Sequence, residues 1–314
     1  MNKTERKNAV KRLWQGFWLV AHPQIWICST IPMLVGTALA YGTTGRFDLY
    51  WFIVGLIGLY FIEIGKNAAN DLMDYATGVD LVVAPRNRTP FSGGRNRALV
   101  NGNVSVFQVT MIAVIMLGFG GVFGIYIALL REPLIFWIGL GGLFLAAAYS
   151  LPPFMLSYRG LGELSVGLAF GPLIVSGAFA IQANFITVEA LLVSLPIGFL
   201  VTNILFINQF PDYEADKLCN KRNWVVRLGK TRGLKVYSGL FLLSYGSIIL
   251  LLIWTRNPFW LLSFISLPFV LKAVKVAKQC YNDIPNLIGA NIGTINVYQL
   301  TGFTMMVSAI LQRR

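Results

Sequence analysis

Runs of about 20 predominantly apolar residues recur along the whole chain, and each is long enough to cross a lipid bilayer as one helix. They are too long and too uniformly apolar for the strands of a membrane barrel, and a helix pairs every backbone group within its own segment. With a mean hydropathy of +0.64 and 12% charged residues, the composition excludes a soluble globular protein. The sequence therefore predicts an all-α, polytopic membrane protein, folded as one domain over 1–314. Its nine expected transmembrane helices lie at 24–42, 49–69, 104–129, 134–152, 164–182, 189–209, 236–254, 259–279 and 288–311.

The net charge of +13 could indicate a nucleic-acid partner, but the placement of the basic residues indicates a membrane topology instead. If the N-terminus is inside the cell and the chain crosses nine times, 21 of the 26 Lys and Arg residues fall on the cytoplasmic side. The outer side receives Arg46, Arg131, Arg256, Arg313 and Arg314. We therefore expect a multi-pass protein of the cell (inner) membrane that binds no nucleic acid. Its basic N-terminal tail, 1–13, is expected to be cytoplasmic and to carry no cleaved signal peptide.

Two long connections interrupt the apolar runs, and both lie on the side predicted to be cytoplasmic. They span 71–103 and 210–235, whereas the loops on the other side are short. Long connections in a compact protein are more often functional than incidental. We therefore expect these two loops to form a cap over a site on the cytoplasmic side.

Acidic residues are concentrated where these two connections begin. The chain has 13 acidic residues, and six of them lie in two short segments: Asp71, Asp74, Asp80, Asp212, Glu214 and Asp216. The spacing from Asn70 to Asp74 recurs from Asn208 to Asp212, and a spacing of four places side chains on one face of a helix. Carboxylates beside hydrocarbon need a cation or a water-filled cavity. Asp and Asn oxygens suit Mg²⁺, which commonly binds one or two carboxylates together with substrate phosphates.

The same residues resemble a family motif. The segment Asn70-Asp71-Leu-Met-Asp74-Tyr75-Ala-Thr-Gly78-Val-Asp80, with Asn208-x-x-x-Asp212-x-x-x-Asp216 and the Lys221-Arg222 pair that follows, resembles the UbiA superfamily of intramembrane prenyltransferases. Gly at 78 and Asp at 80 are similar to the branch that prenylates 1,4-dihydroxy-2-naphthoate for menaquinone. The chain departs from the family pattern at His22, where Arg is common, and at Ser157, where many relatives have Lys. His22 alone reads more simply as a residue of the membrane interface.

This resemblance implies helices around a central cavity and a Mg²⁺-dependent reaction. A polyprenyl group would pass from a polyprenyl diphosphate to an aromatic acceptor, with 1,4-dihydroxy-2-naphthoate expected, as a step of quinone (menaquinone) biosynthesis. The implied catalytic metal ligands are Asn70, Asp74, Asp212 and Asp216, with Asp71, Asp80 and Asn208 in support. The residues expected to bind the substrates are Lys66, Arg159, Arg222, Asn67 and Asn208.

Two other functions remain open from the sequence. One keeps the superfamily and changes the acceptor to 4-hydroxybenzoate, a tetrapyrrole or a glycerol phosphate lipid. The other is a cation-coupled transporter, whose polar residues usually lie at mid-membrane on broken helices. Because the acids here lie at helix ends on one side, the sequence favours the enzyme. It does not determine the acceptor, the prenyl chain length or the oligomeric state.

Overall fold

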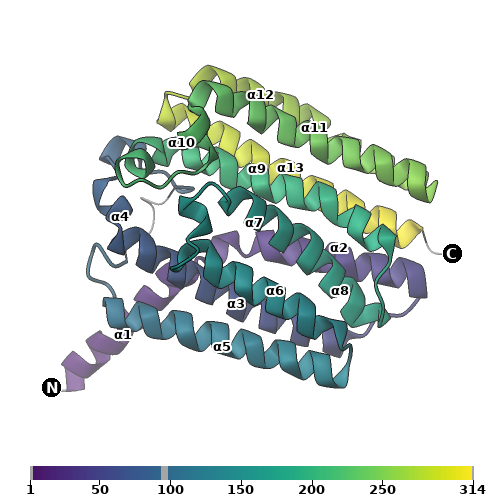
Figure 1. Ribbon diagram of the computed structural model, residues 1–314, viewed down its shortest axis with the longest axis horizontal. Helices are drawn as coiled ribbons and strands as arrows, with labels where there is room; N and C mark the ends of the chain where they lie inside the picture. The colour runs from purple at the N-terminus through teal and green to yellow at the C-terminus, as the bar shows by residue number, and fades with distance from the viewer. Residues whose placement is uncertain (1–2, 93–97, 313–314) are drawn as a thin grey trace.

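The computed structural model describes residues 3–92 and 98–312, and every regular element within them is a helix (Figure 1). The α-helices are α1 (Lys3–Ala21), α2 (Ile27–Thr44), α3 (Leu49–Ala76), α4 (Val79–Val82), α5 (Val106–Leu130), α6 (Leu134–Ser150), α7 (Gly162–Leu168), α8 (Ile174–Ala183), α9 (Val188–Leu218), α10 (Trp224–Leu228), α11 (Lys230–Thr255), α12 (Leu267–Cys280) and α13 (Ile284–Leu311). Short helical turns are η1 (Pro23–Ile25), η2 (Pro85–Asn87), η3 (Leu156–Tyr158), η4 (Ala169–Leu173) and η5 (Pro258–Ser266).

The predicted fold class, an all-α polytopic membrane protein, is confirmed. Within the described residues, seven helical spans are long and apolar enough to cross a membrane. A further pair, 11–25 and α2, passes the same test but bends by 49°, and α6 is apolar but only 17 residues long. Together these correspond to the nine predicted segments. Two of them are composite, because α7, η4 and α8 form one span and η5 and α12 form another.

The helices form a bundle in which helices distant in sequence lie side by side. The closest pairs are α3 with α5, α9 with α11, α2 with α8, and α13 with both α12 and α2. Helix α9 is the most enclosed of the spans, with 72% of its apolar window buried. In Figure 1 the N-terminus, α4 and α10 lie at one end of the bundle, and the C-terminus lies at the other. We call the first the acidic end, because it carries Asp71, Asp74, Asp80, Asp212 and Asp216.

Both acidic motifs are helical, because two helices continue past their predicted ends. Helix α3 runs to Ala76, where Gly78 with a φ of 85° turns the chain into α4. Helix α9 runs to Leu218, with Pro211 inside it. The predicted cap loops, 71–103 and 210–235, thus begin as helix and also contain α4 and α10. Residues 93–97 of the first loop lie outside the described residues, and the predicted tail at 1–13 is helical from residue 3.

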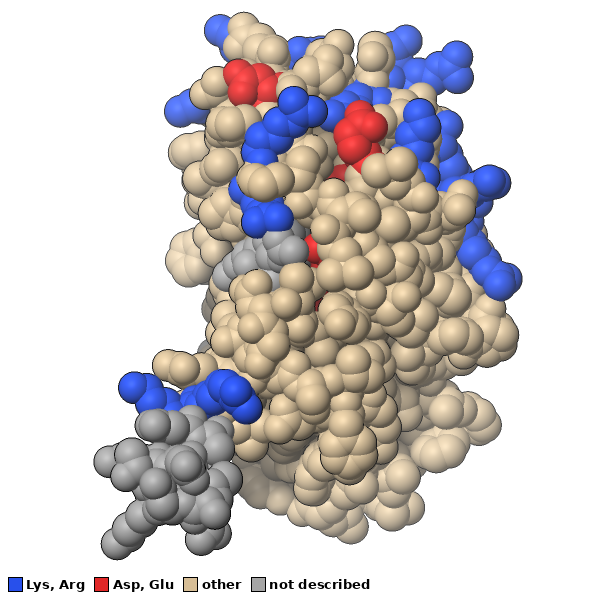
Figure 2. Space-filling view, turned by 90° about the vertical axis from the view of Figure 1, so that its left-hand side faces the viewer, with Lys and Arg blue, Asp and Glu red and all other residues tan. Residues whose placement is uncertain are grey.

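Basic side chains spread over the acidic end of the bundle. Figure 2 looks onto this end and shows many Lys and Arg side chains around a few Asp and Glu, some of them recessed between tan surfaces. Only part of the positive charge can therefore meet the carboxylates, and the rest faces outward. This arrangement agrees with the positive-inside prediction but leaves the orientation in the membrane as a prediction.

Candidate active site

A polar cavity of about 470 Å³ opens at the acidic end, and it unites the two acidic motifs. Seven of the residues proposed as metal ligands or their supports line it: Asn70, Asp71, Asp74, Asp80, Asn208, Asp212 and Asp216. Those from α3 and α9 come from helices far apart in sequence. The cavity is also lined by His22 and Lys221, and by Pro90, Phe91 and Ser92 from the first predicted cap loop.

Asp74 lies at the centre of a hydrogen-bond network in this cavity. The Lys221 ammonium contacts both carboxylate oxygens, at 2.8 and 2.9 Å. The Tyr158 hydroxyl donates to Oδ1 at 2.6 Å, and the Asn70 amide donates to Oδ2 at 3.1 Å. Burial alone would lower the pKa of Lys221, but the charges of Asp74 and Asp216 outweigh it and hold the pKa well above its usual value. Lys221, whose side chain is 14% exposed, is therefore a largely buried cation paired with Asp74.

Asp216 and Asp80 occupy other parts of the same cavity. Asp216 accepts a hydrogen bond from the Asn223 amide at 2.7 Å, and Asn223 in turn caps the first turn of α10. The second Asp216 oxygen, Oδ1, is buried and has no hydrogen-bond partner among the described residues. Burial raises the pKa of Asp80 to about 8, and the carboxylates of Asp74 and Asp71 add to the rise. Both groups thus lie where an added positive charge would be stabilising.

These donors suit a hard divalent cation, although they do not form a closed metal site. Within 3–92 and 98–312, no three His, Cys, Asp or Glu side chains come close enough to hold a metal ion. The Lys221 ammonium takes the place of a cation at Asp74. The donor set consists of carboxylate and amide oxygens, which Mg²⁺ prefers, and the unpartnered Oδ1 of Asp216 is one acceptor already available.

His22 belongs to this cavity rather than only to the membrane interface. Its Nε2 lies 2.9 and 3.0 Å from the two carboxylate oxygens of Asp71. The residue has a φ of 50°, a left-handed conformation that is uncommon outside glycine. No local sequence pattern indicates this contact, since His22 and Asp71 are 49 residues apart.

The five residues predicted to bind substrate separate into four groups, and one of them, Lys66, lines the apolar cavity described below. Asn208 lines the polar cavity and accepts a hydrogen bond from Asn291 of α13 at 2.7 Å. Asn67 is buried and donates to the Ala21 carbonyl oxygen, away from the cavity. Arg159 and Arg222 are exposed and line neither cavity described here.

Several residues that line the cavity or contact its lining were not predicted from the sequence. Lys221 directly precedes Arg222, which is predicted from the sequence to bind substrate. Only the fold distinguishes these two neighbours. Tyr158, Asn223 and Asn291 contact the predicted residues from other elements. Asn291 carried the one usable signal, an amide inside the apolar run 288–311. A polar residue in a membrane helix usually faces the bundle interior.

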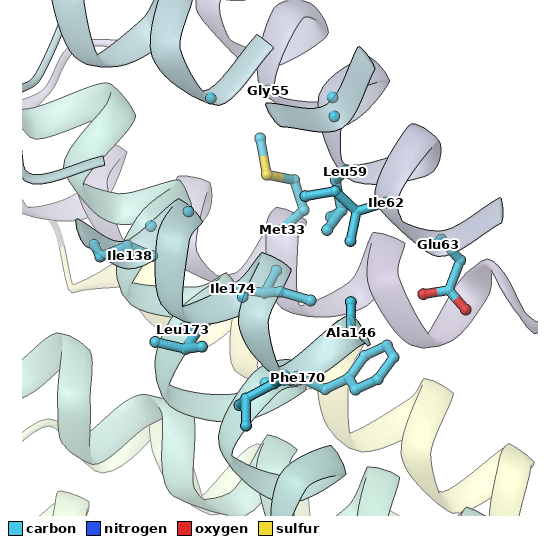
Figure 3. A pocket seen from close by; sticks show the side chains of 18 of the residues that line it. Met33, Gly55, Leu59, Ile62, Glu63, Ile138, Ala146, Phe170, Leu173 and Ile174 are labelled. Atoms are coloured by element: carbon cyan, nitrogen blue, oxygen red, sulfur yellow. The ribbon is translucent and has the colours of Figure 1, made fainter. Parts of the chain in front are cut away.

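A second, apolar cavity of about 150 Å³ adjoins the polar one (Figure 3). Its wall is formed by α3, α5, α6 and the α7–η4–α8 span, with aliphatic side chains such as Leu59, Ile62 and Leu173. Tyr149 of α6 lines both cavities. Along α3, Asn70 and Asp74 line the polar cavity, whereas the apolar one is lined by Gly55, Gly58, Leu59, Ile62, Glu63 and Lys66. The two cavities therefore lie end to end, from the acidic end into the bundle.

The sequence matches a known family over most of its length. The model of the UbiA prenyltransferase family matches residues 29–286. The 1,4-dihydroxy-2-naphthoate octaprenyltransferase of Bacillus subtilis is 27% identical over 99% of this chain and 97% of its own length. The protein of the same description from Escherichia coli is 30% identical over 83% of this chain and 85% of its own length.

A solved structure shares the fold. A UbiA homologue from Archaeoglobus fulgidus bound to GPP and Mg²⁺ superimposes with a TM-score of 0.63, covering 93% of this chain and 99% of its own, at 18% identity. At this identity the likeness is one of fold alone.

Proposed function

The chain belongs to the UbiA prenyltransferase family, and from this premise we propose that it transfers a polyprenyl group from a polyprenyl diphosphate to 1,4-dihydroxy-2-naphthoate, with Mg²⁺ as cofactor. The cytoplasmic side of the cell membrane is the proposed location of the acidic end. The reaction would form a carbon–carbon bond, release diphosphate and remove the ring carboxylate.

One observation carries this proposal: a polar cavity lined by five Asp side chains and Lys221 continues into an apolar one, and Tyr149 lines both. A polyprenyl diphosphate has the same division, with an anionic head and a hydrocarbon tail. The head fits the cavity of Asp74 and Lys221, and the tail fits the wall of Leu59, Ile62 and Leu173. The carbon between head and tail then lies near Tyr149, where the cavities meet.

The residues proposed to hold Mg²⁺ are Asn70, Asp74, Asp212 and Asp216, with Asp71, Asp80 and Asn208 in support. When bound, the metal would neutralise the diphosphate and make it a better leaving group. The unpartnered Oδ1 of Asp216 and the oxygen-only donor set support this assignment. Asn donors add oxygen without charge and so limit repulsion among the carboxylates.

The chain's own cations and hydroxyls would act on the same head group. Lys221 is buried and charged, and its ammonium can donate to a phosphate oxygen when a metal takes over Asp74. Burial and the nearby Asp74 raise the pKa of Tyr158 above its usual range, so its hydroxyl stays protonated and can donate. Fixed donors in a buried site stabilise charge that develops on a leaving group.

The acceptor is proposed from similarity and from sequence spacing. Relatives described as naphthoate octaprenyltransferases match along most of the chain, and Gly78 and Asp80 follow the pattern of that branch. No specific contact favours 4-hydroxybenzoate, a tetrapyrrole or a lipid acceptor. The transporter alternative is set aside because the chain is a prenyltransferase by family.

Purified protein in detergent, given Mg²⁺ and a long prenyl diphosphate, tests the proposal. Both 1,4-dihydroxy-2-naphthoate and 4-hydroxybenzoate should be offered, and the products identified by mass. We expect the prenylated, decarboxylated naphthalene to form and the hydroxybenzoate to react at least tenfold more slowly, a difference of about 1.4 kcal/mol in barrier. Preferential conversion of hydroxybenzoate would refute the acceptor and leave the family unaffected.

A further inference from the structure

A buried ion pair lies in the wall of the apolar cavity, next to the polar one. The Lys66 ammonium is 2.9 Å from Oε1 of Glu63, and both residues belong to α3. Oε2 of Glu63 accepts a hydrogen bond from the Ser29 hydroxyl of α2 at 2.7 Å. Figure 3 shows the Glu63 carboxylate beside the aliphatic side chains of Leu59 and Ile62.

The pair marks the junction of the two cavities. Lys66 precedes Asn70 of the polar cavity by one helical turn, and Glu63 is a further turn into the bundle. Lys66 and Glu63 line the apolar cavity together with Tyr149, which also lines the polar one. The reacting carbon of a prenyl diphosphate is proposed to lie at this same place.

An ion pair inside a membrane helix is costly. The free energy needed to desolvate both charges can exceed the free energy gained from their attraction. Proteins in which apolar residues replace a buried ion pair are often as stable as the original. An ionisable residue within a membrane span therefore indicates a functional site first. Here both members line a cavity instead of filling a packed interface, so a ligand can reach them.

We propose that Lys66 binds the carboxylate of the aromatic acceptor at this junction, and that Glu63 is a positioning residue that holds Lys66 there. The inference rests on the proposed function, in which an anionic aromatic acid must reach the carbon between the diphosphate and the tail. An anion in this apolar setting needs a cation. Among the described residues that line the two cavities, the Lys and Arg side chains are Lys66 and Lys221, and the proposed function already assigns Lys221 to the diphosphate head.

The geometry of the pair leaves Lys66 able to accept a second anion. The Lys66 side chain is 19% exposed and that of Glu63 only 4%, so the ammonium is the more accessible member. Glu63 uses one oxygen for Lys66 and one for Ser29, whereas an ammonium has three N–H donors. The Lys66 Nζ also lies 5.1 Å from the centre of the Phe170 ring, which an aromatic acceptor could adjoin.

The test removes the cation from the protein and the carboxylate from the acceptor in turn. Wild type and Lys66→Met are assayed with 1,4-dihydroxy-2-naphthoate and with 1,4-dihydroxynaphthalene, which lacks the carboxylate. A hydrogen bond to a charged group predicts that Lys66→Met raises the KM for the acid about tenfold or more. The KM for the prenyl diphosphate should change less than twofold, and the preference for the acid over the diol should disappear.

Three further variants guard against a merely structural effect. Lys66→Met leaves Glu63 unpaired, so the double variant Glu63→Gln/Lys66→Met removes both charges and should show the same loss of preference in a better folded protein. Lys66→Arg should restore part of the preference. Lys235→Met, at an exposed lysine that lines neither cavity, is the matched control and should behave as wild type.

The outcomes distinguish a failure of this inference from a failure of the proposed function on which it rests. If wild type prenylates neither compound, the proposed function fails. If wild type prenylates the naphthoate but the double variant keeps its preference for the acid, the inference is overturned and the function stands. A rise confined to the KM of the prenyl diphosphate would also overturn it, by assigning Lys66 to the diphosphate.

Discussion

The two cavities of this protein share α3 and Tyr149, yet they are constructed in opposite ways. The polar cavity depends on hydrogen bonds between distant parts of the chain. Asp74 accepts hydrogen bonds from Lys221, 147 residues away, and from Tyr158, 84 residues away. The apolar cavity depends instead on glycines in its wall, where a larger side chain would occupy the space. Substitutions in one cavity can therefore change the binding of the charged head or of the hydrocarbon tail without altering the other cavity.

The glycines of the apolar cavity show this most clearly. An added Cβ at Gly58 would lie 2.8 Å from Cβ of Phe123, so that glycine serves close packing between α3 and α5. An added Cβ at Gly124, Gly139 or Gly142 would meet nothing within 4 Å, although all three line the cavity. Each glycine costs a helix interior about 0.5–1 kcal/mol relative to alanine. We interpret these three as positions that keep the cavity open.

The largest effect is expected from removing a carboxylate in the polar cavity. Asp212→Ala or Asp74→Ala should lower turnover about 1,000-fold or more, because each takes a ligand from the cation that stabilises the departing diphosphate. Turnover should be compared at saturating prenyl diphosphate and Mg²⁺. Monodispersity in detergent and an unchanged melting profile would be the controls for folding. Near-normal activity of a well-folded Asp212→Ala protein would rule out the proposed metal site.

A smaller and selective effect is expected from filling the apolar cavity. Gly139→Phe should reduce kcat/KM for an octaprenyl diphosphate about 10–100-fold while geranyl diphosphate is affected much less, since an overfilled apolar site costs about 1–3 kcal/mol. The matched control is Gly118→Phe on α5, where the position is exposed and an added Cβ also meets nothing within 4 Å. Equal losses for the short and the long substrate would contradict a tail in this cavity.

The smallest effect concerns protons in the polar cavity. Because the pKa of Asp80 is raised to about 8, its carboxyl is mostly protonated at pH 7, and a bound cation would favour its ionised form. Mg²⁺ binding should therefore release up to about one proton at pH 7 and fewer at pH 9. Calorimetry in buffers of different ionisation enthalpy measures this release without any turnover. Asp80→Asn should lower it, and a release that is equal at both pH values would contradict the assignment.

The sequence by itself determined the helical fold and the acidic residues of the polar cavity. Hydropathy is a local property, so the nine apolar runs predicted the spans, and the position of the acids beside those runs placed them at one end. The four-residue spacing then placed Asn70 with Asp74, and Asp212 with Asp216, on single helix faces. These inferences needed no knowledge of which helices are neighbours.

Only the tertiary structure decided where each basic residue lies relative to the two cavities. Lys221 and Arg222 are adjacent in sequence, yet the first is buried against Asp74 and the second is exposed. Arg159 also faces outward, while Lys66 lies with Glu63 at the junction of the cavities. Equally, Gly118 and Gly124 of α5 differ only in which side of the helix they occupy. Such differences depend on how each helix is rotated and where its end lies against helices far away in the chain, and no local pattern records either quantity.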